Sequence, residues 1–159
     1  MEEYKINPFE KFNKEWALLT AGTKEKFNSM TISWGTMGTI WHKNVITIYI
    51  RPDRYTFEFL EKNKTFTLSF YDEKYKDELT MFGRKSGRDI DKVKESGFTP
   101  IILENGITYK EAKETIVLKK LYMEQIKKEN LTEEIKEFYK EDIPTHYIII
   151  GEIMEIKKW

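Results

Sequence analysis

The sequence predicts a mainly β protein in which a Greek-key antiparallel barrel carries helical insertions. Six separate stretches are rich in β-branched and aromatic residues, which favour strands. Helical patterns are inserted between some of these stretches, and this arrangement favours an antiparallel barrel over alternating βαβ units. The predicted strands are Trp16–Thr23, Ser29–Thr36, Val45–Ile50, Thr65–Phe70, Thr115–Gln125 and His146–Ile156.

Three helical patterns interrupt the strands in the first hundred residues. Asp53 is a good N-cap residue for a helix over Arg54–Lys62, because its carboxylate can accept from backbone N–H groups of the first turn. Tyr75–Phe82 reads as a second helix, which we expect Gly83 to end. A shorter helix is expected over Asp89–Glu95, ending at Ser96-Gly97.

Residues 111–140 are dense in lysine and glutamate. Thr132 is expected to cap an amphipathic helix there, and Pro144 separates that helix from the last strand. The alternating charges favour a solvated face with ion pairs one turn apart. A partner-binding or lid segment is the alternative.

Composition excludes several classes of function. The 159 residues are enough for one domain with its own core, and we expect a single domain over residues 1–159. The 27 basic and 27 acidic residues give a net charge of +0, so no global field attracts nucleic acid or an anionic membrane. The chain has no cysteine, which excludes disulfides and thiolate metal sites. No apolar run is long enough for a signal peptide or a membrane span, and we expect a cytoplasmic protein without a metal site.

Residues 28–35, Asn-Ser-Met-Thr-Ile-Ser-Trp-Gly, alternate as a strand does. Apolar side chains are expected on one face of this strand and hydroxyls on the other. The apolar residues are Met30, Ile32 and Trp34, and the hydroxyl residues are Thr31 and Ser33.

The segment Arg51–Thr56 leaves a β-branched strand on an arginine and enters a helix through Asp53. Together with the neighbouring strand it offers an apolar wall, hydroxyls, an arginine and a helix N-terminus, which suit a planar ring that carries a phosphate. The alternative is a half-buried strand beside an ordinary capped helix, with Arg54 as a solvated helix residue.

A second phosphate candidate is the small turn Lys85-Ser86-Gly87-Arg88, with Lys92 one helical turn further on. A phosphate between this turn and Arg51 would explain why both basic groups are present. Arg88 has a simpler alternative, an ion pair with Asp89 or Asp91.

Four stretches, in order along the chain from about Trp16 to Glu155, resemble the flavin reductase-like family of FMN-binding split barrels, which includes flavoredoxin. They are Asn28-x-Met30-Thr31-x-x-Trp34-Gly35, Arg51-x-x-x-Tyr55-Thr56, Phe82-Gly83-x-x-Ser86-Gly87-Arg88-Asp89-x-Asp91-Lys92, and His146 shortly before Gly151-Glu152-Ile153.

The resemblance implies an FMN-binding split barrel and a set of cofactor-binding residues. Arg51 and Lys92 match basic positions associated with the phosphate, and Thr31 and Ser86 match hydroxyl positions nearby. Backbone N–H groups of Ile32 and Trp34 are placed to meet the ring edge, while the Trp34 side chain is expected in the core. The residues implied to bind FMN are Asn28, Met30, Thr31, Ile32, Ser33, Trp34, Arg51, Tyr55, Thr56, Ser86 and Lys92.

The resemblance also implies a catalytic role for His146, near the open face of the flavin. The alternative is a strand-end histidine that satisfies a loop carbonyl. The function so implied is an NAD(P)H-using flavin reductase, a homodimer that passes a hydride to FMN and on to a flavin or redox-protein acceptor. A flavoredoxin-type electron carrier without NAD(P)H activity and a non-catalytic ligand-binding barrel are the alternatives, and a lack of basic-aromatic stripes disfavours nucleic acid.

Overall fold

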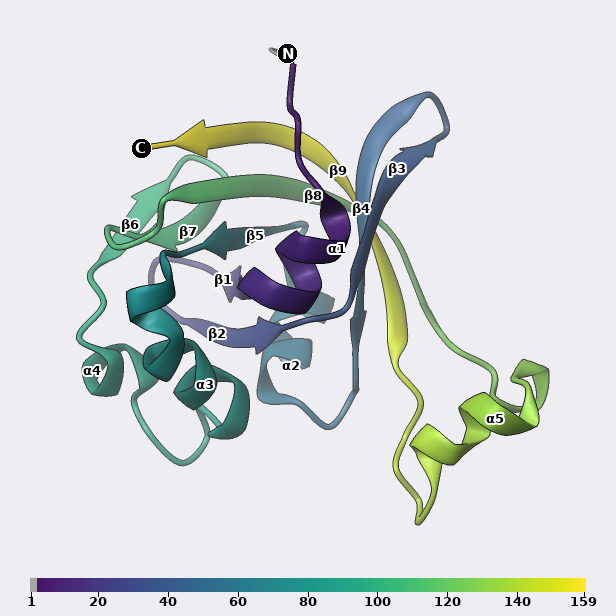
Figure 1. Cartoon of the computed structure of the whole chain (residues 1–159). Helices are drawn as coiled ribbons and strands as arrows, with labels where there is room; N and C mark the ends of the chain where they lie inside the picture. Colours follow the sequence, from purple (N-terminus) through teal and green to yellow (C-terminus); the bar gives the residue numbers. More distant parts are fainter. Residues whose placement is uncertain (1–2) are drawn as a thin grey trace.

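The computed structural model describes residues 3–159, and a seven-stranded antiparallel sheet forms its body (Figure 1). The strand order is β2-β1-β5-β8-β9-β4-β3, so β2 and β3 are the two edges of this sheet. A second sheet pairs β6 with β7. The strands are β1 (Ala17–Gly22), β2 (Phe27–Ile32), β3 (Gly35–Ile40), β4 (Lys43–Ile50), β5 (Thr65–Phe70), β6 (Pro100–Leu103), β7 (Gly106–Tyr109), β8 (Glu114–Gln125) and β9 (Tyr147–Lys158).

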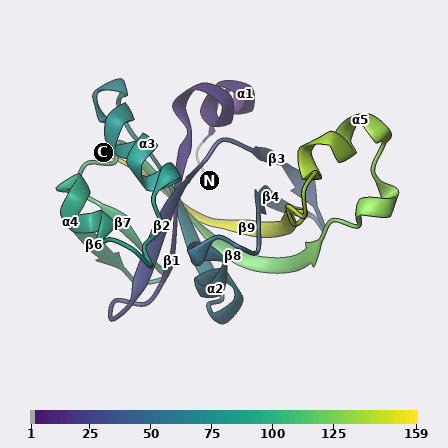
Figure 2. The same cartoon turned by 90° about the horizontal axis from the view of Figure 1, so that it is seen from below.

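Short helices lie around the sheet, with α2 packed on β1 and β2 and with α3 packed on β2 (Figures 1 and 2). The helical elements are α1 (Pro8–Glu10), the π-helical turn η1 (Lys11–Glu15), α2 (Tyr55–Lys62), η2 (Glu73–Tyr75), α3 (Lys76–Arg84), α4 (Lys92–Ser96), η3 (Lys128–Asn130), α5 (Glu133–Lys136) and η4 (Glu137–Tyr139).

The prediction of a mainly β, antiparallel fold with helical insertions is confirmed. Each of the six predicted strands corresponds to a strand of the large sheet. The sequence reasoning missed β3, β6 and β7. The β6–β7 hairpin has four residues on each side, which is too short for a periodic pattern to be recognised.

The predicted strand Ser29–Thr36 is two strands that belong to opposite edges of the sheet. Ile32 pairs with Ala17 of β1, whereas Gly35 pairs with Ile48 of β4. The chain therefore crosses from one edge to the other within Ser33 and Trp34. A Cβ atom on Gly35 would lie 2.5 Å from the ring of Phe12, so glycine permits this close approach.

The crossing corrects the prediction that Trp34 shares a buried face with Met30 and Ile32. Met30 and Ile32 lie in the core, while the Trp34 side chain is 47% exposed. Strand alternation ends at Ile32, because Trp34 stands outside any strand ladder.

Asp53 does not cap helix α2, contrary to the prediction. Arg54 is the N-cap residue and makes no capping hydrogen bond with its side chain. The Asp53 carboxylate instead accepts two hydrogen bonds from Arg51, Nε to Oδ1 at 3.0 Å and Nη2 to Oδ2 at 2.9 Å. This bidentate, charge-assisted pair outcompetes the cap for the carboxylate.

Helix α3 runs to Arg84, so Gly83 lies inside its last turn and does not end it. A Cβ atom on Gly83 would lie 3.3 Å from Cβ of Thr31. This glycine therefore serves the packing of α3 on β2. Its helix-ending role, inferred from sequence, is wrong.

Helix α4 is shorter than predicted and begins at Lys92. The side chain of Asp91 caps it by accepting from the backbone N–H of Lys94 at 3.1 Å. Gly97, with φ of 73°, ends it in the left-handed conformation, as the sequence predicted.

Residues 126–146 form an arm between β8 and β9, which projects from the body in both views (Figures 1 and 2). Thr132 precedes α5 but makes no capping hydrogen bond with its side chain. The amphipathic helix predicted after Thr132 is two short ones, α5 and η4, and their ion pairs join residues three apart, such as Lys136 with Glu133 (3.0 Å).

Two hydrophobic clusters hold the body together. The larger one fills the inside of the sheet with side chains from all its central strands, including Leu19, Ile48, Leu68 and Ile149. The smaller one lies under α3 around Phe82. Strand β2 is covered on both sides, so Asn28 and Ser29 are buried although they are polar.

Candidate functional site

The basic cavity, of about 170 Å³, lies where β2, the start of α2 and the loop after α3 meet. Asp53 is the one acidic residue among the described residues that line it. In a chain whose total charge is balanced, this is a strong local excess of positive charge. The cationic residues around it are Arg51, Arg54, Arg84, Lys85, Arg88 and Lys92.

Lys92 is the most deeply buried of these cations, at 5% exposure. Its Nζ donates to the backbone carbonyls of Ser29 at 2.9 Å and Phe82 at 2.8 Å. Burial, and secondly the positive charge of Arg54, lower the pKa of Lys92 to about 8. Carbonyl dipoles thus hold the ammonium group without cancelling its charge.

Arg54 is a partly buried member of the cluster, not the solvated residue of the sequence alternative. Its Nη2 donates to the carbonyl of Gly83 at 2.9 Å, which links α2 to the end of α3. Burial and the neighbouring charge of Arg51 lower the pKa of Arg54. Crowded cations of this kind favour an anion as a further partner.

Arg88 pairs with Glu58 of α2, with Nη2–Oε2 at 3.1 Å, and not with Asp89 or Asp91. Its guanidinium also lies over the ring of Tyr55, at 4.9 Å from the centroid. Both contacts close the loop after α3 over the start of α2.

Hydroxyl and amide groups complete the wall of the basic cavity. Asn28 Nδ2 donates to Thr56 Oγ1 at 2.8 Å, and Ser86 Oγ accepts from the backbone N–H of Arg88 at 3.1 Å. A Cβ atom on Gly87 would lie 2.2 Å from Asn28 Oδ1, so the loop fits closely against β2.

The junction cavity, of about 290 Å³, shares Arg51 and Arg54 with the basic cavity. Its other walls are mostly apolar and aromatic. They come from β2, the crossing after it, β4 and the arm, and the residues are Met30, Trp34, Tyr49, Ile50, Phe138, Ile143 and His146.

The aromatic cavity is the largest of the three, at about 600 Å³, and it shares Trp34, Tyr49 and His146 with the junction cavity. Its far wall is the N-terminal segment. That wall consists of Pro8, Phe9, Phe12 and Asn13, and the remaining lining residues are Ser33, Gly35, Thr36, Met37, Ile126 and Tyr139.

His146 stands where the junction and aromatic cavities meet. Its ring lies 4.9 Å from that of Trp34, at an interplanar angle of 42°. Its Nδ1 is 2.7 Å from the hydroxyl of Tyr139. Burial and the charge of Arg51 lower the pKa of His146, against a smaller opposing effect of Asp53, so the imidazole is neutral near pH 7.

Most of the predicted site residues come together along this row of cavities. Asn28, Arg51, Tyr55, Thr56, Ser86 and Lys92 line the basic cavity, and Met30, Ser33, Trp34 and His146 line the other two. Thr31 and Ile32 line none of the three. The Thr31 hydroxyl donates to the carbonyl of Leu79 in α3 at 2.5 Å, and Ile32 lies in the core.

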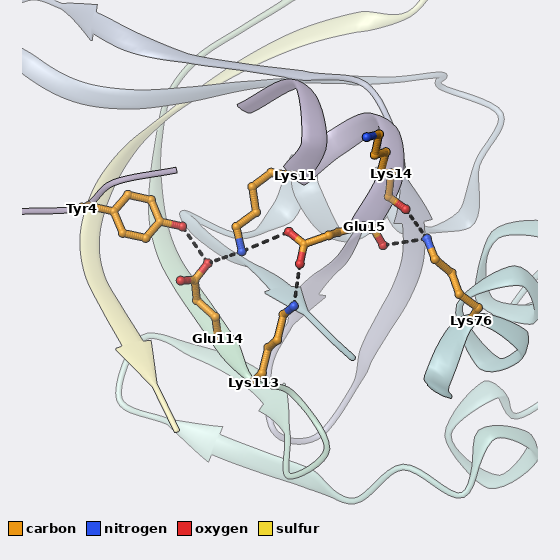
Figure 3. Close-up of polar contacts among 7 residues, drawn as sticks. All are labelled: Tyr4, Lys11, Lys14, Glu15, Lys76, Lys113 and Glu114. Atoms are coloured by element: carbon orange, nitrogen blue, oxygen red, sulfur yellow. Dashed lines mark hydrogen bonds and ion pairs between the residues drawn. The ribbon is translucent and has the colours of Figure 1, made fainter. Parts of the chain in front are cut away.

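The N-terminal wall was missed by sequence reasoning, and a compact ionic cluster fastens it to the start of β8 (Figure 3). Lys11 Nζ lies 3.1 Å from a carboxylate oxygen of Glu114 and 3.3 Å from one of Glu15. Lys113 reaches Glu15 at 2.5 Å, and the Tyr4 hydroxyl donates to Glu114 at 2.6 Å. Apart from the local Lys11–Glu15 pair, no sequence pattern marks these contacts, because they join residues about a hundred positions apart.

On the far side of the same wall, Lys76 of α3 donates to the carbonyl oxygens of Lys14 and Glu15 (Figure 3). Its ammonium group also lies over the ring of Trp16, at 3.7 Å from the centroid. The N-terminal segment is thus held from two directions.

The sequence model of the flavin reductase like domain matches residues 9–118, which are most of the chain and include both the basic cavity and the crossing at Trp34. The chain belongs to this family. The predicted membership of the flavin reductase-like family is thereby confirmed; three of the four motifs lie within the matched residues, and the fourth, at His146, lies outside them. The functional class is flavin-related oxidation and reduction.

Solved flavin reductase-like structures share the fold. Flavoredoxin from Methanosarcina acetivorans is 20% identical, with a TM-score of 0.72 over 100% of this chain and 76% of that one. Flavoredoxin of Desulfovibrio vulgaris (Miyazaki F) is 23% identical, with a TM-score of 0.71 over 91% and 69%. An FMN-binding protein from Thermus thermophilus is 20% identical, with a TM-score of 0.71 over 99% and 80%.

At these identities the likeness concerns the fold, and it confirms the split-barrel class. Comparison with curated proteins gives no match. Within residues 3–159, no helix combines the length and apolar character that crossing a membrane requires. The same residues contain no group of three or more His, Asp or Glu side chains close enough to hold a metal ion.

Proposed function

We propose that this flavin reductase-like protein is an FMN-dependent oxidoreductase that takes a hydride from NAD(P)H and passes electrons to an acceptor. One observation carries the proposal: the cation-rich basic cavity shares wall residues with the junction cavity, which in turn shares wall residues with the aromatic cavity. A ligand with an anionic group attached to a flat ring matches this row of cavities.

The residues present fit the cofactor. A phosphate monoester carries nearly two negative charges at neutral pH, and the basic cavity has uncompensated positive charge together with the hydroxyls of Thr56 and Ser86. Met30 and Trp34 in the junction cavity provide flat apolar surface beside Arg51. In the site that we propose, Arg51 and Lys92 hold the phosphate, and the junction cavity receives the ring.

When bound, FMN would supply the ring system that accepts a hydride and releases electrons. The chain's own residues bind, orient and exclude water. Strand β2 is an edge strand, and in the proposed site backbone N–H groups near its end, at Ile32 and Trp34, meet the polar edge of the ring. The neutral His146 can donate a hydrogen bond at the open end without adding charge.

The aromatic cavity is the proposed place for the hydride donor or the acceptor. Its walls suit flat, weakly polar molecules. Two similar structures support this view: the Thermus thermophilus protein with bound 1-cyclohex-2-enone, and a Streptomyces globisporus NADH:FAD oxidoreductase. A flavoredoxin-type carrier is the second candidate, supported by the likeness to two flavoredoxins.

Anaerobic spectroscopy separates these functions. Purified protein is mixed with FMN, and bleaching of the flavin band is followed after addition of NADH or NADPH. Rapid bleaching is expected for the reductase. A band that persists until a reduced protein donor is added identifies the carrier. Both functions are contradicted if the protein loses FMN on a desalting column as readily as it loses riboflavin.

We also propose a homodimer located in the cytoplasm. Large apolar side chains are exposed on the adjoining strands β8 and β9 and at the tip of the β3–β4 hairpin, where Tyr122, Met154, Ile40 and Trp41 lie. Exposed apolar surface of this kind commonly marks an interface, and two-fold pairing is the commonest arrangement. Light scattering at micromolar concentration is expected to give twice 19.1 kDa. The mass of one chain in the FMN-bound state contradicts the dimer.

A further inference from the structure

Tyr139 is a buried residue of the projecting arm that reaches back to the candidate site. It is 4% exposed, although its neighbours Phe138 and Lys140 are exposed. Its ring centroid lies 5.6 Å from that of His146, and its hydroxyl lies 2.7 Å from His146 Nδ1. A buried hydroxyl aimed at one ring nitrogen suggests a defined role.

The direction of this hydrogen bond follows from the groups involved. A phenol is a good O–H donor, and the unprotonated nitrogen of a neutral imidazole is a good acceptor. If Nδ1 carried the proton instead, the Tyr139 O–H would need another acceptor, and none is found among residues 3–159. The lowered pKa of His146 agrees with a neutral ring. Tyr139 therefore donates to Nδ1, and the proton of the imidazole lies on Nε2.

Hydrogen bonds at the base of the arm hold Tyr139 next to His146. The backbone N–H of Ile126 donates to the carbonyl of His146 at 2.9 Å, and Thr145 Oγ1 donates to the carbonyl of Ile126 at 2.6 Å. Lys128 Nζ donates to the carbonyl of Tyr139 itself at 2.9 Å. These contacts close the ends of the arm and hold η4 over the histidine.

Tyr139 occupies Nδ1 of His146, and one face of the imidazole ring packs on Trp34. The Nε2 edge is therefore the part of the ring that can meet a ligand in the two cavities that His146 lines. Arg51 and Asp53 are the charged groups whose fields reach the ring. They are a bidentate pair, so they leave the donor at Nε2 in place.

We propose that Tyr139 is a positioning residue that fixes His146 in the Nε2–H tautomer, and that this N–H donates to an oxygen of a flat ring ligand at the meeting of the junction and aromatic cavities. The ligand oxygen is of the carbonyl or phenolate class. The ligand part of the inference rests on the proposed function, whereas the tautomer does not.

Nuclear magnetic resonance of the imidazole nitrogens tests the tautomer without any cofactor. The chain has two histidines, so His42, in the β3–β4 turn, is an internal reference. Wild type is expected to show protonated Nε2 and unprotonated Nδ1 at His146. In Tyr139→Phe, the bias toward Nε2–H should fall roughly fivefold, the effect of one net hydrogen bond, and the pKa of His146 should rise, because the neutral form has lost a donor. Signals of His42 should not change.

A His146 signal protonated at Nδ1 in wild type, or an unchanged tautomer ratio in Tyr139→Phe, overturns the proposal. The variant keeps the aromatic ring, so it is expected to fold. Tyr75→Phe, at a tyrosine of η2 that lines none of the three cavities, is the matched control.

The second arm uses FMN-loaded protein and stopped flow. In Tyr139→Phe, the rate of flavin reduction by NADH or of reoxidation by menadione should fall, and the limb of its pH profile that belongs to His146 should move upward, with FMN affinity unchanged. Unchanged rates and pH profile overturn the positioning role. Wild-type protein that binds no FMN contradicts the proposed function instead, and the tautomer measurement then decides the inference alone.

Discussion

Two clusters of charge in this protein have opposite character. Around Glu114, the cations Lys11 and Lys113 face the anions Glu15 and Glu114, and Tyr4 donates to the same carboxylate (Figure 3). Around the basic cavity, six cationic residues have two carboxylate partners, Asp53 for Arg51 and Glu58 for Arg88, and the best-buried cation has only carbonyl partners. The first cluster is complete in itself, and the second leaves positive charge and space.

The difference shows why the presence of charged residues alone does not indicate function. In a self-paired cluster every charged group already has a partner of opposite charge, so none is left for a ligand. This cluster instead fastens the N-terminal segment to β8. A cluster with surplus charge beside a cavity gains stability from a ligand of opposite sign. The comparison therefore predicts that changes in the first cluster alter stability, and changes in the second alter binding.

The largest expected effect is in the Glu114 cluster. Lys11→Met leaves the buried carboxylate of Glu114 without its cation, since the two side chains are only 11% and 7% exposed. Breaking a buried pair by removing one partner costs about 3–5 kcal/mol. Urea unfolding should show a loss of this order, while the affinity of the folded protein for FMN stays the same.

Lys14→Met is the matched control in the same segment. Its side chain is 72% exposed and pairs with Glu10, so its stability should change by less than about 0.5 kcal/mol. A similar loss in both variants would mean that the ionic cluster does not fasten the wall.

The next effect concerns the basic cavity, where FMN should bind at least tenfold more tightly than riboflavin. Charge-assisted hydrogen bonds contribute about 1.5–3 kcal/mol each, and riboflavin lacks the phosphate that would accept them. Arg51→Ala and Lys92→Ala should weaken FMN binding by a similar factor with little change for riboflavin, as measured by flavin fluorescence quenching. The exposed Lys94 of α4 provides the control, Lys94→Ala. Equal affinities for the two flavins would refute the phosphate assignment.

A smaller, pH-dependent effect follows from Lys92. Its pKa in the folded protein, about 8, lies below the ordinary value of 10.5, so the ammonium form is lost as pH rises through 8. A phosphate stabilises that form, and FMN affinity should therefore fall between pH 7 and 9, with proton uptake on binding at pH 8 measurable by calorimetry in two buffers.

Without FMN the sign is reversed. The unfolded chain holds this proton up to a higher pH than the folded one, so the contribution of Lys92 to the free energy of unfolding rises as pH increases from about 8 to 10.5. Lys92→Met should flatten both dependences. An FMN affinity that is constant from pH 7 to 9 in wild type would argue against Lys92 as a phosphate ligand.

The smallest predicted effect returns to the first cluster. Tyr4→Phe removes the hydrogen bond to Glu114 but leaves the Lys11 ion pair. A loss of about 1 kcal/mol is expected, the net value of a typical hydrogen bond, and the melting temperature should fall accordingly. If Tyr4→Phe destabilised as much as Lys11→Met, the tyrosine and not the ion pair would be the main fastening.

Sequence reasoning identified the strands because their signal is local. Residues of Thr65–Phe70 show their β-branched, aromatic composition in the chain itself, and that strand occurs with the predicted bounds. Gly97 was recognised as a helix end for the same reason. Predictions failed where two local options competed, as at Asp53, whose carboxylate could cap a helix or pair with Arg51, and the pair formed.

The candidate site was predictable in part. The family motifs led to Arg51, Ser86 and Lys92, and the fold brings these residues to one cavity. Arg54 was read as a solvated residue, because its burial depends on α3, which lies far along the chain. Tyr139 was not recognised either, since nothing around it in the arm distinguishes it from its exposed neighbours.

By itself the sequence determined the class of fold and the family, and it contained the motifs that are proposed to hold a phosphate, because these depend on residues close together in the chain. Only the tertiary structure decided how Trp34 stands between two edges of one sheet, how Lys11 meets Glu114, and which partner His146 finds. The physical reason is that such contacts join residues whose separation along the chain carries no signal. They form where the packing of strands brings two groups together. Because these groups are buried, leaving them unpaired would cost free energy.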